Sequence, residues 1–409
     1  MASFSIALTG LQADMVSLNT IGNNLANLNT TAFKKQSTTF EDLFYQQIGT
    51  SGSNNPLQVG VGTKVSGTAT NFLQGSMSTT ANSTDMALQG NGFFVVQQGG
   101  VQSLTRAGNF QLDSVGNLTT ASGQQVMGYP SAGGVIDTNA ALVPLSVPVG
   151  VNEAAQATQN FSVTANLNAA ATTGTAVTTP VTIYDSLGDS HALTVTYTKT
   201  GSNTWDYAVT LPSGDATGTP VNNTGTLTFD SAGKLVTPAA NVSGIQFPGL
   251  ADGASDLSFN WNLYKSTGVA TIAQSIAASS ATASSQDGFA SGTYQSFTVD
   301  SSGVISASFS NGHTANIGQV AVASVTNAEG LTKVGNNNYM TTSASGAASI
   351  GVAGAGGRGT IEDSALEQSN VDISTEFADL IIAQRAFQAN SKTITTFDSV
   401  TQDTIGMIR

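Results

Sequence analysis

The sequence predicts an α+β fold that is mainly β. Long N- and C-terminal helices form a coiled-coil-like axial domain, and two antiparallel β-rich domains lie between them, the second inserted in the first. Residues 4–28 and 373–408 carry a helical apolar period with few Gly and no Pro. The chain between them alternates short apolar runs with Gly-containing turns, as antiparallel sheets do. The strand pattern of residues 71–145 resumes over 285–357, after a segment of different composition.

The N-terminal helix is expected to run from about Phe4 to Asn27. Asp14 is its one charged residue. An apolar seam of heptad period requires a helical partner along its length. The seam recurs every seven residues, with further apolar side chains at companion positions: Phe4, Leu11, Leu18 and Leu25, then Ala7, Ile21 and Leu28.

The C-terminal helix carries a similar stripe, at Ile373, Phe377, Leu380, Phe387, Ile394 and Phe397. Each terminal helix is therefore expected to pack on the other, or on copies of both from neighbouring molecules. The alternative is a helix docked only on its own globular domain. The candidate assembly residues are Leu11, Leu18, Ile21, Leu25, Phe377, Leu380, Phe387 and Ile394.

The composition excludes several classes of function. Only 9% of residues are charged and the net charge is −13, with 12 Lys plus Arg, which argues against nucleic acid and anionic membranes as partners. The chain has no cysteine, so disulfides and thiolate chemistry are absent. The first residues lack a basic region followed by a continuous apolar run, and no run of 18 apolar residues occurs. We therefore expect no membrane insertion, and any export would proceed without a cleaved signal peptide.

Residues 90–129 predict strands and turns in close alternation. The expected strand cores are Phe93–Val96, Phe110–Leu112 and Val126–Tyr129. Asp-Ser-x-Gly occurs at 113–116, 185–188, 230–233 and 300–303, each between apolar runs. Asp at the first and Gly at the fourth position favour a type I turn closing a hairpin. Calcium ligation is the alternative, but it requires six or more converging oxygens.

Candidate catalytic and metal-binding groups are few. His191 and His313 are the only histidines, each beside a turn, and with no cysteine they argue against a zinc site of the usual ligands. Three carboxylate pairs could in principle serve a glycosidase, although exposed turns account for the first two. These pairs are Asp185/Asp189, Asp252/Asp256 and Glu362/Asp363. We therefore predict no enzyme, no cofactor and no metal.

Both ends of the chain resemble the flagellar rod and hook proteins of bacteria. NTIGNNLANLNTTAFKKQSTTFEDLF (19–44) is similar to the N-terminal signature of that family, and SALEQSNVDISTEFADLIIAQRAFQANSKTITTFDSVTQDTI (364–405) to its C-terminal signature. GNGFFVV and LTRAGNFQLDSVGNL, within 90–118, are similar to its body domain. Ala32 and Ser364 stand where the family commonly has Gly, and Ala32 calls into question the positive φ of that turn.

The middle of the chain resembles the hook members of this family, in IYDSLGDSHALTV (183–195), LTFDSAGKL (227–235) and NGHTANIGQVAVASVTNAEGLTKVGNNNYMTT (311–342). The resemblance implies a subunit of the curved, flexible, hollow hook, the universal joint that transmits torque from rod to filament. It also implies the partners of such a subunit: copies of itself, the distal rod protein, the hook cap protein, the hook–filament junction protein and the flagellar type III export apparatus. The location implied is extracellular, in the hook.

Four parts are expected along the chain. They are an axial helical domain (1–33 and 371–409), a linking arm (34–70 and 358–370), an inner β domain (71–145 and 285–357) and an outer β domain (146–284). Two other functions remain open from the residues. A distal-rod protein shares both ends but lacks a middle domain of this size, and a secreted β-rich adhesin or glycan-binding protein would need no assembling helices.

Overall fold

The computed structural model describes residues 2–50 and 55–407. The chain forms two compact units. The inner unit comprises residues 1–147, 297–307 and 315–409, and the outer unit comprises residues 148–296 and 308–314. The outer unit is thus an insertion in the chain of the inner one. The predicted class, mainly β with a helix at each end, is confirmed.

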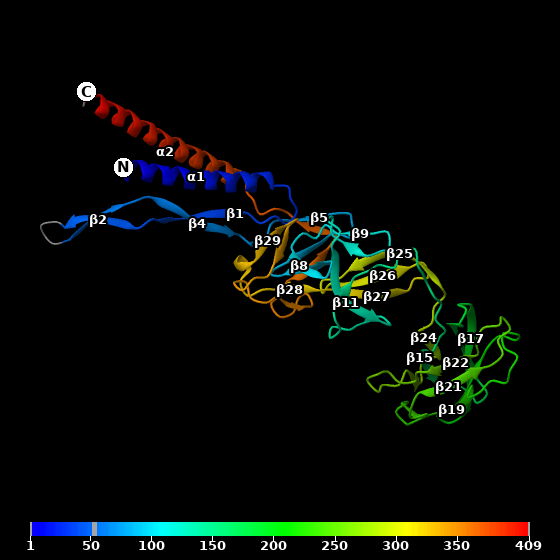
Figure 1. Cartoon of the computed structure of the whole chain (residues 1–409). Coiled ribbons are helices and arrows are strands. Elements are labelled where there is room, and N and C mark those ends of the chain that lie inside the picture. The colour runs from blue at the N-terminus through cyan, green and yellow to red at the C-terminus, as the bar shows by residue number, and fades with distance from the viewer. Residues whose placement is uncertain (1, 51–54, 408–409) are drawn as a thin grey trace. The chain divides into compact units, whose positions relative to one another are not determined.

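The two terminal helices lie close to where the apolar period places them. Helix α1 spans Ala2–Ala26 and helix α2 spans Ile373–Met407. The predicted end of the second helix, Ile408, lies outside the described residues. Asp372 Oδ1 accepts a hydrogen bond of 2.7 Å from the Thr375 amide, which caps the start of α2. The two helices pack side by side (Figure 1).

A long β ribbon follows α1 in the chain. Strand β1 (Gln36–Asp42) pairs with β4 (Thr63–Thr70), and β2 (Tyr45–Thr50) pairs with β3 (Pro56–Gly60), all antiparallel. The β1–β4 part contacts α1, and the Thr38 hydroxyl donates to the Thr20 hydroxyl at 3.0 Å (Figure 1). Most of the segment expected as a linking arm therefore folds as two paired strand segments, which we call the ribbon (residues 36–50 and 55–70).

The rest of the inner unit is an antiparallel sheet system. The predicted strand cores Phe93–Val96 and Val126–Tyr129 are confirmed, whereas Phe110–Leu112 is only partly right, because Phe110 is buried outside a strand and Gln111 is exposed. Strand β7 pairs with β8, β11 and β28 around a core that contains Phe93, Leu104, Met127 and Tyr339. Strands β25 (Gly292–Val299) and β26 (Val304–Phe309), like the first residue of β27, belong in part to the outer unit. The others are β5 (Met77–Thr79), β6 (Met86–Gln89), β7 (Phe93–Gln98), β8 (Val101–Thr105), β9 (Gln111–Leu112), β10 (Leu118–Thr119), β11 (Gln125–Ala132), β12 (Val135–Ile136), β13 (Val143–Pro144), β27 (Thr314–Val320), β28 (Val322–Ser324), β29 (Thr332–Gly335), β30 (Asn338–Met340), β31 (Ser349–Gly351), β32 (Thr360–Asp363) and β33 (Ala365–Glu367).

The outer unit contains two five-stranded sheets that share one apolar core. Both tryptophans of the chain, Trp205 and Trp261, are fully buried there. One sheet is antiparallel throughout, and the other is mixed, because β15 runs parallel to β22 and β23. The strands of these two sheets are β15 (Asn160–Asn168), β16 (Ala176–Tyr184), β17 (Ser190–Gly201), β18 (Thr204–Thr210), β19 (Thr224–Phe229), β20 (Leu235–Thr237), β21 (Val242–Phe247), β22 (Leu257–Trp261), β23 (Ile272–Ser275) and β24 (Ser280–Gln286). A further short strand, β14 (Asn152–Glu153), pairs with β25.

The four Asp-Ser-x-Gly turns adopt one geometry, and their prediction as hairpin turns is confirmed. In each, the aspartate Oδ1 accepts backbone hydrogen bonds from the residues two and four positions later. The glycine has a positive φ of 76° to 92°. Oδ1 of each aspartate is therefore committed to its own turn.

The two positions where Gly gives way to another residue keep the left-handed conformation. Ala32 has a φ of 54° and Ser364 a φ of 52°. The Ala32 amide donates to the Glu367 carbonyl at 2.8 Å, and its side chain is buried. Surrounding contacts therefore hold a conformation that Ala resists when alone. The question that the sequence raised about this turn is answered: the positive φ is retained.

Ala32→Val is expected to lower the free energy of unfolding of the inner unit by more than about 2 kcal/mol, because a β-branched residue at positive φ adds strain to overpacking. Ala32→Gly is the control. Glycine relieves the backbone strain at this φ, but the variant loses a buried methyl group and its unfolded chain has more conformational entropy. We therefore expect the free energy of unfolding to change by no more than about 1 kcal/mol. Urea unfolding followed by far-ultraviolet circular dichroism checks both. A valine variant as stable as the parent would contradict the argument.

Candidate assembly interface

Helices α1 and α2 approach each other through small and polar side chains. Ala7, Ala13 and Ala383 are buried. At Gly10, a Cβ would lie 2.8 Å from the amide nitrogen of Asn390, so a larger residue does not fit without movement. The Asn390 amide also donates to Asp14 Oδ2 at 2.8 Å. Asp14, the one charge of α1, is thus satisfied by its partner helix.

The predicted seam residues lie mostly at the margin of this pair. Ile21 is buried, and Phe377 exposes 48% of its surface. The remaining six are half-buried: Leu11, Leu18, Leu25, Leu380, Phe387 and Ile394. The structure therefore places the eight residues on the helix pair, but it does not gather them on one open face.

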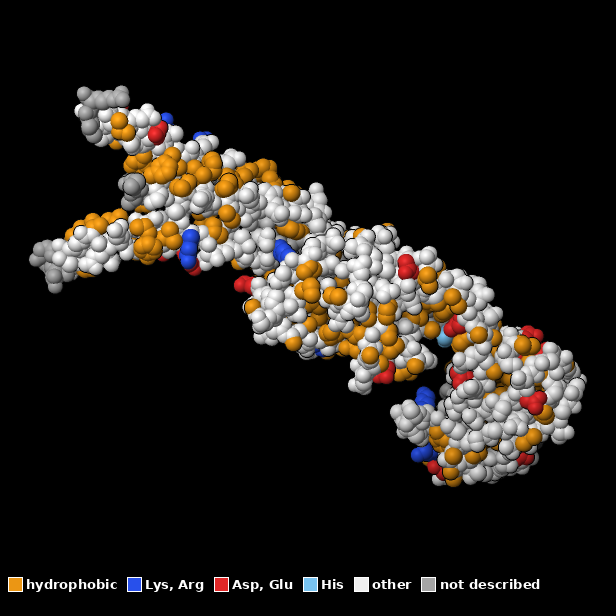
Figure 2. Space-filling view, viewed as in Figure 1, with side chains coloured by type: hydrophobic (Ala, Val, Ile, Leu, Met, Phe, Trp, Pro, Cys, Tyr) orange, Lys and Arg blue, Asp and Glu red, His pale blue; other side chains and the backbone are white. Residues whose placement is uncertain are grey.

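A wider set of apolar residues on the helices is more exposed. It includes Phe4, Ile373 and Phe377 from the predicted stripes, whereas the sequence did not single out its other members. Figure 2 shows hydrophobic side chains gathered over the helices. A periodic signal was present, since Leu8 and Met15 are seven apart, while Ile373, Phe377 and Ile381 are each four apart. We define the apolar helix face as the exposed residues Phe4, Leu8, Met15, Val16, Ile373, Phe377, Ile381, Ile382, Val400 and Ile405.

The ribbon also presents apolar side chains to solvent (Figure 2). Polar partners such as Glu41 and Ser66 alternate with them along the strands. Exposed contiguous apolar surface of this kind marks a contact surface in soluble proteins. The exposed ribbon residues are Phe40, Phe44, Tyr45, Ile48, Leu57 and Val59.

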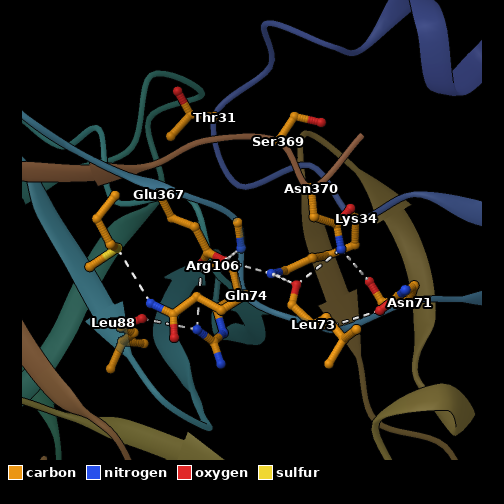
Figure 3. A network of polar contacts seen from close by, with 12 residues as sticks. Thr31, Lys34, Asn71, Leu73, Gln74, Leu88, Arg106, Glu367, Ser369 and Asn370 are labelled. Carbon is orange, nitrogen blue, oxygen red and sulfur yellow. Dashed lines mark hydrogen bonds and ion pairs between the residues drawn. The ribbon is translucent and has the colours of Figure 1, made fainter. Parts of the chain in front are cut away.

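Three charged residues form a buried anchor between the terminal segments and the sheets. Glu367 Oε1 lies 2.6 Å from Lys34 Nζ, and Glu367 Oε2 lies 3.4 Å from Arg106 Nη1 (Figure 3). The side chains of Lys34 and Glu367 are fully buried, and that of Arg106 is 6% exposed. Further donors and acceptors complete the network, because Lys34 also donates to the Leu73 carbonyl and the Gly75 amide donates to Glu367 Oε1, both at 2.8 Å. We call this network the Glu367 anchor.

Burial sets the electrostatics of the anchor. It lowers the pKa of Lys34 and the pKa of Arg106, because the charged forms lose hydration, while the charge and hydrogen bonds of Glu367 oppose both shifts. Burial also raises the pKa of nearby Tyr339 to about 12. Because the site excludes water, loss of any one of these three charges would leave another buried charge without its partner, which is strongly unfavourable.

The residues flanking the anchor tie α1 to the ribbon and to α2. Asn24 donates to the Gln36 carbonyl at 2.8 Å and accepts from the Gln36 amide at 2.9 Å, so the asparagine bridges to backbone. Its side-chain amide also lies 3.2 Å from Glu376 Oε2. Lys35 Nζ pairs with Glu376 Oε1 at 3.0 Å. These contacts hold the C-terminal end of α1 against the first residue of β1 and the first turn of α2.

The anchor residues were in the sequence signatures, although the sequence analysis did not single them out. Lys34, Arg106 and Glu367 lie in the three separate segments that carry the resemblance at residues 19–44, 90–118 and 364–405. Each segment supplies one charge. No local signal marks these three residues, because each segment holds other charges as well, such as Lys35, Asp113 and Glu376.

The two histidines have different environments within the outer unit. His313 Nδ1 lies 2.8 Å from Glu153 Oε1, and its ring stacks on Phe289 at 4.0 Å. His191 lies beside Asp185, which is fully buried. The interpretation of Asp185/Asp189 as a pair in an exposed turn is therefore wrong for Asp185, because the turn folds its side chain inward under His191.

The terminal helices bear on a separate question. Among the described residues, neither α1 nor α2 is long and apolar enough to cross a membrane.

Comparison with protein families matches four segments of the chain. "Flagella basal body rod protein" matches residues 4–34, and "Flagellar basal body rod FlgEFG protein C-terminal" matches 362–407. "Flagellar hook protein FlgE/F/G D1 domain" matches 87–166, and "Flagellar basal body protein FlaE D2 domain" matches 165–289. The matches follow one another along the chain in the order that the resemblance implied.

Whole-length relatives agree with these matches. The chain is 33% identical to the flagellar hook protein FlgE of Treponema pallidum over 100% of both chains, and 34% identical to that of Escherichia coli K12 over 97% of this chain and 98% of the relative. A crystal structure of the Helicobacter pylori flagellar hook protein FlgE2 shares the fold, with a TM-score of 0.53, 17% identity, and coverage of 70% of this chain and 99% of that one. The chain belongs to the flagellar hook protein family, whose members are structural subunits of the bacterial flagellar hook.

Proposed function

We propose that this chain polymerises into a curved, flexible, hollow tube that transmits torque between rod and filament. The apolar helix face carries the proposal. The two helices contact each other at Gly10, Asp14 and Asn390, yet isoleucine, leucine and phenylalanine side chains of the pair remain exposed. Copies of the same face would cover these side chains in the polymer. The seam residues Leu11, Leu18, Ile21, Leu25, Phe377, Leu380, Phe387 and Ile394 would support the same packing.

The Glu367 anchor supplies a route for force within the inner unit. Lys34 follows α1 and Glu367 precedes α2, whereas Arg106 belongs to the sheet system. A load on either helix therefore reaches the sheets through buried, charge-assisted contacts. The outer unit would contribute flexible contacts, since a surface with few charges forms neighbour contacts without fixed ion pairs.

The partners and location of the chain follow from this role. A tube between rod and filament would contact the distal rod protein at one end and the hook–filament junction protein at the other. Growth at the open end would proceed under a hook cap protein, with subunits delivered by the flagellar type III export apparatus. The finished tube would be extracellular. No step in this role is catalytic.

Negative-stain electron microscopy of purified protein seeded with broken hooks tests the proposal. We expect the full chain to extend the seeds as curved tubes, and a chain lacking residues 1–33 to form none, because it loses α1 and with it half of the helix pair. Tryptophan fluorescence checks that the outer unit is folded, since both tryptophans lie there, and far-ultraviolet circular dichroism checks the sheets of the inner unit. Tubes from the truncated chain would contradict helix-driven assembly, and straight rigid tubes from the full chain would contradict the flexible joint.

A further inference from the structure

Four titratable side chains converge in the outer unit, away from the assembly surfaces. His191 is at the start of β17, and its backbone pairs with Ile183 of β16. The hairpin turn between these strands carries Asp185, while Asp215 and Asp252 come from two later loops. The imidazole is therefore surrounded by three carboxylates from three separate places in the sequence.

The distances at His191 Nε2 are long for charge-assisted hydrogen bonds. Nε2 lies 3.4 Å from Asp185 Oδ2 and 3.5 Å from Asp252 Oδ2. All three atoms lie within 4.8 Å of one another. By contrast, His313 Nδ1 approaches Glu153 to 2.8 Å, the usual length of a charge-assisted hydrogen bond. Two ligand atoms held at about 2.1 Å by one tetrahedral metal are about 3.4 Å apart.

Within the cluster, only one long hydrogen bond, of 3.4 Å between His191 Nε2 and Asp185 Oδ2, engages the imidazole nitrogen that faces the two carboxylates. Asp185 Oδ1 accepts three backbone amides, from Leu187, Gly188 and Asp189, so Oδ2 alone faces the ring. On the other side of the ring, Nδ1 lies 3.2 Å from Asp215 Oδ2. An Nδ1–H that donates to Asp215 leaves the Nε2 lone pair directed at two carboxylates.

Charge and burial make this arrangement costly without a cation. The Asp185 side chain is fully buried and that of His191 is 8% exposed. Within the described part of the chain, neither Lys nor Arg forms an ion pair with Asp185, Asp215 or Asp252. A proton on Nε2 would offset one negative charge and could form one short hydrogen bond. Asp185 Oδ2 and Asp252 Oδ2, however, lie at nearly equal distances from Nε2. A divalent cation would bind both carboxylates and the nitrogen together.

We propose that Asp185, His191 and Asp252 bind one divalent metal ion of the zinc type, with Asp215 as the residue that positions the imidazole. One imidazole and two carboxylates suit zinc better than calcium or magnesium, which take oxygen ligands only. The Asp252 side chain is 24% exposed, which leaves an entry path and room for a water as fourth ligand. This proposal departs from the sequence expectation of no metal. The ion would tie the 185–188 turn to two distant loops of the outer unit.

Isothermal titration of the full chain with ZnCl2, after treatment with a chelator and dialysis, tests the site. We expect one zinc per chain, lost in His191→Asn and in Asp252→Asn. Since Asp252 is partly exposed, its variant remains informative if the His191 variant fails to fold. His313→Asn is the matched control and should keep the full stoichiometry. Loss of binding only in the His313 variant, or binding unchanged in the Asp252 variant, would overturn the assignment.

Two further readouts separate the roles of the residues. Asp215→Asn should keep one site but weaken zinc affinity about 10- to 100-fold, because the carboxylate orients the ring and raises its basicity. Zinc should also raise the urea midpoint of tryptophan fluorescence in the parent, since Trp205 and Trp261 report the outer unit, and should leave it unchanged in Asp252→Asn. No saturable binding by the parent would overturn the proposal and leave the hook function unaffected.

Discussion

Glu367→Gln is expected to destabilise the inner unit by about 3–5 kcal/mol. The substitution keeps the size of the side chain and an acceptor for the Gly75 amide. It removes the only carboxylate that pairs with the buried Lys34 and Arg106 among the described residues. Two cations then remain desolvated without a counter-charge, which costs more than the original pair contributed.

The two units allow this effect to be assigned to one of them. Both tryptophans lie in the outer unit, so the unfolding transition that their fluorescence reports should keep the urea midpoint of the parent. Far-ultraviolet circular dichroism should show a second transition at lower urea, from the inner unit. Glu362→Gln is the matched control, because this glutamate is exposed on neighbouring strand β32 and should change stability by less than about 0.5 kcal/mol. Equal effects of both substitutions would refute the role of the anchor.

Ile381→Asp is expected to abolish tube formation while leaving the monomer as stable as the parent. Ile381 exposes 56% of its surface on the apolar helix face, so the monomer loses little packing. In the polymer each copy would bury a carboxylate where an isoleucine contributed about 1.5–3 kcal/mol. Every subunit contact would lose this free energy. The critical concentration for assembly would therefore rise above the protein concentration of the experiment.

Gln384→Asp adds the same charge to the same helix and serves as its control. Gln384 is exposed one turn from Ile381 but lies outside the apolar helix face. We expect this variant to extend hook seeds as curved tubes in electron microscopy, and to sediment as the parent does. Tubes formed equally well by Ile381→Asp would show that the face points to solvent in the assembly.

The sequence predicts the helices and turns well because the signals that specify them are local. The apolar period of residues 4–28 and 373–408 requires only neighbours three and four positions apart. Each Asp-Ser-x-Gly turn is specified within five residues, through the aspartate that accepts its own backbone amides. The family resemblance also rests on contiguous motifs, and the comparisons confirm it.

The same periodicity could not tell which side of each helix would be covered. Leu11 and Leu18 are half-buried at the margin of the pair, whereas Leu8 and Met15 are exposed. Both pairs have heptad spacing, so a count of apolar residues does not distinguish them. The choice depends on which side of α1 another element covers, as at Gly10, whose small size lets Asn390 of α2 approach closely.

By itself, then, the sequence determined the class of fold, the insertion of one β unit in another, the hairpin turns and the family. Only the tertiary structure decided that Lys34, Arg106 and Glu367 share one buried site, and that Asp185 turns inward beneath His191. The physical reason is the separation along the chain of the residues that interact. Backbone turns and helices are stabilised by contacts between residues close in the chain, whereas the burial of a charge depends on which distant segments exclude water from it.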